Sequence, residues 1–265
     1  MSFQHQLDAK SDIRIESTAV QEIMDCQDGL VEERLPFTVK IVRNDNELGK
    51  AVSIRRSAYA RHLPALAATL ASPEELDCEE DSVIVLAESK LDGSPVGTMR
   101  IQNNYSGKLA LEHAVDLPEW LQGRRMIEIS RFGVAEGRMG RLAKTVLVKA
   151  GFQYSLLNDI EWIVITARAP LDTLYEKLLF QDVFPNRGFI PMPHVGNIPH
   201  RILAFDVRNA YASWSAAKHP LLDFMCKTFH PDLRIATNDA STRNVVARLP
   251  NEYLNSGLNP LANTR

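Results

Sequence analysis

An acid and a base lie three residues apart inside an otherwise apolar stretch of this chain, Glu128-Ile129-Ser130-Arg131-Phe132-Gly133-Val134. The stretch predicts a strand, and burying either charge there without a partner is costly. Strict alternation would put Glu128 and Arg131 on opposite faces, so a bulge between them would let both reach one site and would open backbone N–H groups. The stretch therefore predicts either a polar site within a sheet or a buried ion pair that only orders the fold.

Length and composition narrow the class of protein. A chain of 265 residues is long enough for one large α/β domain with extra segments at both ends. Its 30 basic and 33 acidic residues include no long basic run, so we expect no nucleic-acid partner. Cys26, Cys78 and Cys226 lack the spacing of a zinc or redox motif and indicate a reducing compartment. Without a signal peptide or a transmembrane segment, the chain is expected to be cytoplasmic.

Hydrophobic periodicity gives the order of the secondary-structure elements. Strands are predicted over residues 36–43, 82–87, 96–101, 127–134, 162–166 and 202–207, and helices from Asn44 to about Tyr59 and over 138–157, 170–179 and 210–229. Residues 64–76 form a connection or second helix, and residues 185–199 are expected to be irregular, so that His194 and His200 are interpreted as loop histidines. This order predicts an α/β fold with a central mixed β-sheet flanked by helices.

Further charged residues occur at positions that should face the protein interior. Arg55 lies seven residues after Leu48 and four before Tyr59, on the apolar stripe of the first helix, so its guanidinium is expected to point inward. The strands at 82–87 and 96–101 are expected to form a hairpin. Arg100 lies near the end of the second of these strands, and an acidic cluster precedes the first. The cluster comprises Asp77, Glu79, Glu80 and Asp81.

Four segments in this order resemble the acyl-homoserine-lactone synthases and, more closely, the N-acyl amino acid synthases, which share the GNAT-like (acyl-CoA N-acyltransferase) fold. They are Arg55-x-x-x-Tyr59, the acidic cluster ending at Asp81, residues 93–100 and residues 128–134, with a weaker match from Tyr175 to Phe180. The resemblance covers roughly residues 36–207. It divides the chain into an N-terminal arm (1–35, helical or partly disordered), an acyltransferase domain (36–207), and a C-terminal helical extension with a flexible tail (208–265).

The resemblance implies an acyltransferase that moves a long-chain fatty acyl group from acyl carrier protein to the amino group of a small acceptor, most simply an amino acid. No metal or other cofactor is implied. Glu128 is the expected general base, a role that suits a buried carboxylate. The arginines suit the acceptor's carboxylate, and Asp81 would hold those arginines or the acceptor's ammonium group. The assigned site residues are Glu128 and Arg131 (catalytic) and Arg55, Tyr59, Asp81, Arg100 and Phe132 (substrate-binding).

Two departures from related families affect the substrates. Residues 62–71 lack the tryptophan of the lactone synthases, which disfavours a lactone product made from S-adenosylmethionine. Arg141 replaces the central glycine of the coenzyme A pyrophosphate loop, which favours a carrier-protein donor docked on Arg138, Arg141 and Lys144. Two alternatives stay open: a lactone synthase, and a non-catalytic member of the fold that binds an acyl chain or a partner protein.

Overall fold

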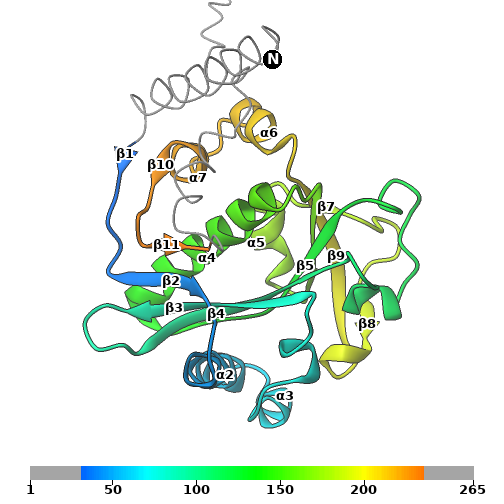
Figure 1. Ribbon diagram of the computed structural model, residues 1–265. Helices are drawn as coiled ribbons and strands as arrows, with labels where there is room; N and C mark the ends of the chain where they lie inside the picture. Colours follow the sequence, from blue (N-terminus) through cyan, green and yellow to red (C-terminus); the bar gives the residue numbers. More distant parts are fainter. Residues whose placement is uncertain (1–30, 236–265) are drawn as a thin grey trace, which may run out of the picture.

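A computed structural model describes residues 31–235 of the protein (Figure 1). One large mixed sheet has the strand order β11-β2-β3-β4-β5-β6-β9-β7, and β8 pairs with β9. Its strands are β2 (Phe37–Ile41), β3 (Ser82–Ser89), β4 (Pro95–Asn103), β5 (Met126–Val134), β6 (Trp162–Ala167), β7 (Gln181–Asp182), β8 (Ile190–Met192), β9 (Ile198–Asp206) and β11 (Leu233–Arg234). The predicted mixed sheet of an α/β fold is therefore confirmed.

Helices cover both faces of this sheet. Helix α4 lies over one face, and α2 and α3 lie over the other (Figure 1). The helices are α2 (Asp45–Ala60), α3 (Pro64–Thr69), α4 (Gly137–Leu157), α5 (Asp172–Lys177), α6 (Ala210–Ala216) and α7 (Leu222–Cys226), with 3-10 turns η2 (Glu75–Asp77), η3 (Ala110–His113) and η4 (Pro193–Val195). Within residues 31–235, no helix combines the length and hydrophobicity that crossing a membrane would require.

Local sequence features explain how helix α2 is placed. The side chain of Asn44 caps the helix by accepting a hydrogen bond from the N–H of Glu47 at 3.0 Å. The helix packs closely on β5 because Gly133 has no side chain: a Cβ there would lie 3.0 Å from the Cβ of Ala58. This close packing brings Arg55 to the sheet, and the arginine is fully buried as predicted.

The predicted bulge in β5 is present. Ser130 pairs with Arg100 and Gly133 pairs with Thr98, so two residues of β5, Arg131 and Phe132, stand opposite the single residue between them on β4. Arg131 has a φ of 51°, an uncommon left-handed conformation for a residue other than glycine. The bulge turns Arg131 to the sheet face that carries Glu128.

Strands β5 and β6 pair in parallel only as far as Ile129 and Ile165. Beyond that point the remainder of β5, residues 130–134, is no longer paired with β6 in the register of the two strands. The sheet therefore opens next to the bulge.

Several predicted elements differ from the structure. The single helix expected over residues 210–229 is wrong: Pro220 lies between α6 and α7, where it could not supply a helical N–H, and the chain then forms β10 (Thr228–Phe229). The segment expected to be irregular contains strand β8. Helix α5 begins at Asp172 and ends at Lys177, so it is shorter at both ends than the helix predicted over residues 170–179.

The chain beyond residue 207 contributes to the sheet system. Strand β10 pairs in parallel with β1 (Val31–Glu32), and β11 pairs in parallel with the outer edge of β2. The division at residues 35 and 207 stays a prediction, and most of the predicted arm and tail lies outside the described residues.

Candidate active site

Three arginines from three different elements converge on two carboxylates. Arg55 of α2 donates two hydrogen bonds to Asp77, at 2.7 and 2.9 Å. Arg131 of β5 donates two to Glu74, at 2.5 and 2.6 Å. Arg100 of β4 reaches both carboxylates at 3.3 Å. This arginine cluster, Arg55, Arg100, Arg131, Glu74 and Asp77, ties α2, the segment before β3, and strands β4 and β5 together.

The two carboxylates of the arginine cluster stay charged at neutral pH. Burial acts to raise the pKa of Asp77, but the hydrogen bonds and charge of Arg55 outweigh it and lower that pKa. Burial likewise opposes the shift at Glu74, where hydrogen bonding and charge from Arg131 lower the pKa. Three positive and two negative groups leave the cluster one positive charge in excess.

The first alternative for Asp81, that it holds the arginines, is wrong, and the second, that it holds the acceptor's ammonium group, stays a prediction. Glu74 and Asp77 hold the arginines, and no ion pair among residues 31–235 involves the side chain of Asp81. Its backbone carbonyl instead accepts hydrogen bonds from Asn103. The turn η2 explains the choice, because the carboxylate of Asp77 caps its own turn by accepting from the N–H of Glu74 and is thereby directed inward.

Glu128 lies on the same sheet face and is completely buried. Its Oε2 accepts a hydrogen bond from the N–H of Leu111 at 2.9 Å, while Oε1 has no hydrogen-bond partner among the described residues. Burial raises the pKa of Glu128 from 4.5 to about 7, against the opposing effects of the Leu111 N–H and of the charges on Arg100 and Arg131. The carboxyl can therefore take up and release a proton near neutral pH.

His194 also belongs to this site, which sequence reasoning missed. Its Nε2 lies 3.7 Å from Oε1 of Glu128. Burial, with the charge of Arg131 adding to it, lowers the pKa of His194 to about 4, so the ring is neutral at pH 7 and forms no ion pair with Glu128. The available signal was the pair Gly196-Asn197, which is typical of hairpin turns and lies in the β8–β9 hairpin that carries the histidine.

A cavity of about 230 Å³ opens where β5 and β6 separate. We call it the acyl cavity, after the ligand that we propose it binds. Its apolar lining includes Leu63, Leu66, Ile129, Phe132, Leu171 and Val195, and Tyr59 and Arg131 also border it. Two of the predicted substrate-binding residues, Tyr59 and Phe132, therefore face a cavity. Arg55 and Arg100 do not line it and are buried.

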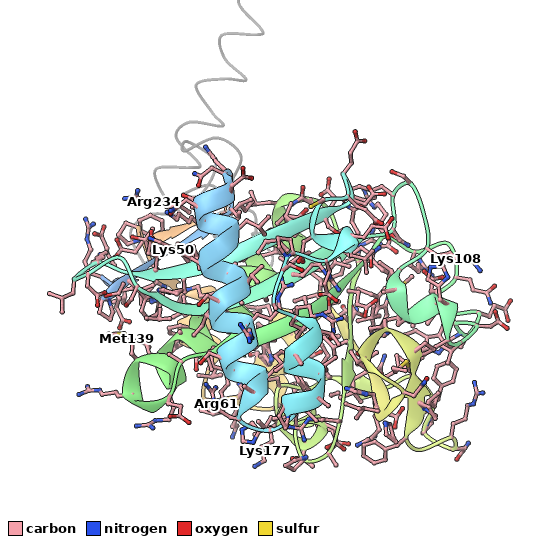
Figure 2. All side chains as sticks on the ribbon, turned by 90° about the horizontal axis from the view of Figure 1, so that it is seen from below. Lys50, Arg61, Lys108, Met139, Lys177 and Arg234 are labelled. Carbon is pink, nitrogen blue, oxygen red and sulfur yellow. The ribbon has the colours of Figure 1, made fainter. Side chains whose placement is uncertain are left out.

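A second cavity of about 260 Å³, here called the polar cavity, adjoins the acyl cavity at His194. Five polar or charged residues border it together with three apolar ones: Glu79, Gln102, Lys108, His113 and His194, and Leu76, Ala110 and Pro193. Figure 2 labels one bordering residue of each cavity, Arg61 for the acyl cavity and Lys108 for the polar one, and shows them well apart. His194 is the one described residue that lines both cavities.

The start of α4 carries the predicted docking residues. Arg138, Arg141 and Lys144 are all exposed, and Lys144 also borders the acyl cavity. Three cations therefore lie on one helix beside that cavity. Residues 31–235 contain no group of three or more His, Cys, Asp and Glu side chains placed to hold a metal ion.

A family model and a solved structure that are similar to this chain carry the same family description. The family model "N-acyl amino acid synthase FeeM" matches residues 50–204, more than half of the chain. The solved structure of FeeM from uncultured soil microbes, an N-acyl amino acid synthase, is 20% identical with a TM-score of 0.55, and the match covers 71% of this chain and 98% of FeeM. No curated protein sequence matches the chain.

A second solved structure, the coenzyme A-dependent acyl-homoserine lactone synthase BjaI with MTA, shares the fold. It is 15% identical with a TM-score of 0.50, and the match covers 80% of this chain and 98% of BjaI. Together with the mixed sheet flanked by helices, these likenesses confirm the GNAT-like fold.

Proposed function

Because the chain belongs to the FeeM family of N-acyl amino acid synthases and has a GNAT-like acyltransferase fold, we propose that it transfers a fatty acyl group from acyl carrier protein to the amino group of an amino acid. One observation carries the proposal: Glu128, buried in the central strand with a pKa of about 7, lies 3.7 Å from His194, the one described residue that lines both cavities. An N-acyltransferase needs a base near the point where the acyl donor and the amine meet.

The acyl cavity suits the fatty chain and its thioester. Its lining is largely apolar, and burying each methylene of an acyl chain is worth about 0.8 kcal/mol. The backbone of β5 beyond Ile129 borders this cavity without a β6 partner in the strand register. N–H groups at the bulge are therefore the proposed donors to the oxyanion of the tetrahedral intermediate.

The polar cavity suits the amino acid. The arginines, expected to bind the acceptor's carboxylate, are buried and already hold the carboxylates of Glu74 and Asp77. Lys108 at the rim of the polar cavity is exposed and forms no ion pair with the described residues. We therefore assign the acceptor's carboxylate to Lys108, and the arginine cluster to holding β4 and β5 in place.

The exposed cations Arg138, Arg141 and Lys144 support a carrier-protein donor. Acyl carrier proteins are acidic, and a positive patch beside the acyl cavity would steer and orient such a partner. A donor of this kind places the reaction in the cytoplasm. Comparable rates with acyl-coenzyme A and acyl carrier protein would refute this assignment of the donor.

The test is mass spectrometry of lipid extracts from cells that overproduce the protein, followed by assays of purified protein with long-chain acyl carrier protein and a mixture of amino acids. We expect N-acyl amino acids, and an acyl-homoserine lactone or no acylated product would refute the proposal. Glu128→Gln should lower turnover about 100-fold or more because the amide cannot accept the proton. The exposed Glu119 provides a matched control, Glu119→Gln, which should retain full activity.

A further inference from the structure

We propose that His194 relays the proton from the acceptor's amine to Glu128, an inference that rests on the proposed function. Glu128 is completely buried and lines neither cavity, so an amine bound in the polar cavity cannot reach the carboxylate directly. His194 lies between them: it lines both cavities and approaches Glu128.

The hydrogen bonding of the histidine fits a relay. Neither ring nitrogen has a partner among the described residues, and Oε1 of Glu128, 3.7 Å from Nε2, has none either. This distance is longer than a hydrogen bond, and catalytic hydrogen bonds commonly shorten only in the substrate complex. The residue itself is fixed, since Arg131 donates a hydrogen bond to its backbone carbonyl at 2.9 Å.

His200 provides the contrast within the same hairpin. It is buried and lines the acyl cavity, but its Nδ1 is occupied by the backbone carbonyl of Ile198 at 2.7 Å. His200 is therefore tied to its own strand. Of the two histidines in this hairpin, only His194 combines free ring nitrogens with proximity to Glu128.

The relay balances protons as follows. Nδ1 of His194 accepts one proton from the acceptor's ammonium group while Nε2 gives its proton to Glu128, so the ring remains neutral and only its tautomer changes. The freed amine attacks the thioester carbonyl and forms the C–N bond. The intermediate then breaks the C–S bond, and the second proton on nitrogen goes to the departing sulfur to give a thiol. The proton on Glu128 returns to solvent by the reverse route.

Chemical rescue tests the relay in the full-length enzyme. His194→Ala should lower kcat about 100-fold or more and leave a space that imidazole from the buffer can enter. Added imidazole should then raise the kcat of His194→Ala at least about tenfold. Any loss caused by the matched variant His200→Ala should not respond to imidazole, because that ring has a structural hydrogen bond to Ile198.

Three outcomes with the two alanine variants would overturn the relay. They are a kcat for His194→Ala within about threefold of the wild type, a loss that imidazole does not restore in the folded variant, and equal rescue of His200→Ala. If His194→Ala does not fold, His194→Asn must show the same loss of kcat with the acceptor's KM within about twofold of the wild type, and a larger change in KM would refute the relay. A wild-type enzyme that makes no N-acyl amino acid would instead refute the proposed function.

Discussion

Glu128→Gln is expected to make the protein more stable above neutral pH while removing its activity. The buried carboxylate has no counter-charge at hydrogen-bonding distance, so ionising it destabilises the folded state. Glutamine has nearly the same shape and keeps an oxygen for the N–H of Leu111, but it does not ionise.

The size of the effect follows from the pKa of Glu128. Its pKa of about 7 in the folded protein lies above the ordinary 4.5, so the stability contributed by its protonated form is fully present below 4.5 and is lost as the pH rises through 7. At about 1.4 kcal/mol for each pH unit between these values, the wild type loses about 3 kcal/mol that Glu128→Gln does not lose. The melting temperature of the variant minus that of the wild type should therefore be about 6–12 °C larger at pH 8 than at about pH 4.

The measurement is urea unfolding of both proteins, followed by tryptophan fluorescence, at a series of pH values from about 4 to 8. The difference in unfolding free energy should be flat below pH 4.5, rise between pH 4.5 and 7 and level off above about pH 7. A difference independent of pH would show that Glu128 has an ordinary pKa in the folded protein. A variant less stable than the wild type at pH 8 would show that the carboxylate is ionised and stabilised by the arginines, and would refute the reasoning.

Three further predictions concern the charged groups around the site. Asp77→Asn should cost about 3–5 kcal/mol because it leaves Arg55 buried without its main counter-charge, whereas Asp81→Asn should change the unfolding free energy by less than about 0.5 kcal/mol; equal effects in urea unfolding would contradict this. Lys108→Ala should raise the acceptor's KM about tenfold at unchanged kcat, whereas the exposed Lys218→Ala should not, and an unchanged KM would remove Lys108 from the acceptor site. Arg141→Glu should slow acyl transfer from acyl carrier protein and weaken its salt dependence, while a rate insensitive to both the substitution and salt would exclude docking at this position.

The sequence predicted those features that depend on periodicity. The strands and helices from Phe37 to Lys177 occur in the predicted order, and Arg55 is buried because its place on an apolar stripe fixes its direction. The bulge was predictable for a related reason. A strand that must bring Glu128 and Arg131 to one face has to break its alternation, and the structure confirms that it does.

Features that depend on loops were not predictable in this way. The sequence does not show which of several neighbouring acidic residues faces inward, because the cap of turn η2 decides it. For this reason the sequence predicted Asp81 as the partner of the arginines, whereas the structure has Asp77 in that place. His194 likewise obtains its role from the hairpin that carries it, and its spacing from other histidines says nothing about its distance from Glu128. Two-residue strands such as β11 show no periodicity at all.

The pairing of β11 with β2 has a consequence for synthesis on the ribosome. The N–H of Leu35, just before β2, bonds to the carboxylate of Asp232 across 197 residues of sequence, so β2 is made long before its outer neighbour exists. In the interval the nascent chain exposes an open strand edge, which can pair with a second chain. Translation must therefore reach Arg234 before this edge is closed. The pairing of β11 with β2 is then the step that protects a newly made molecule from aggregation.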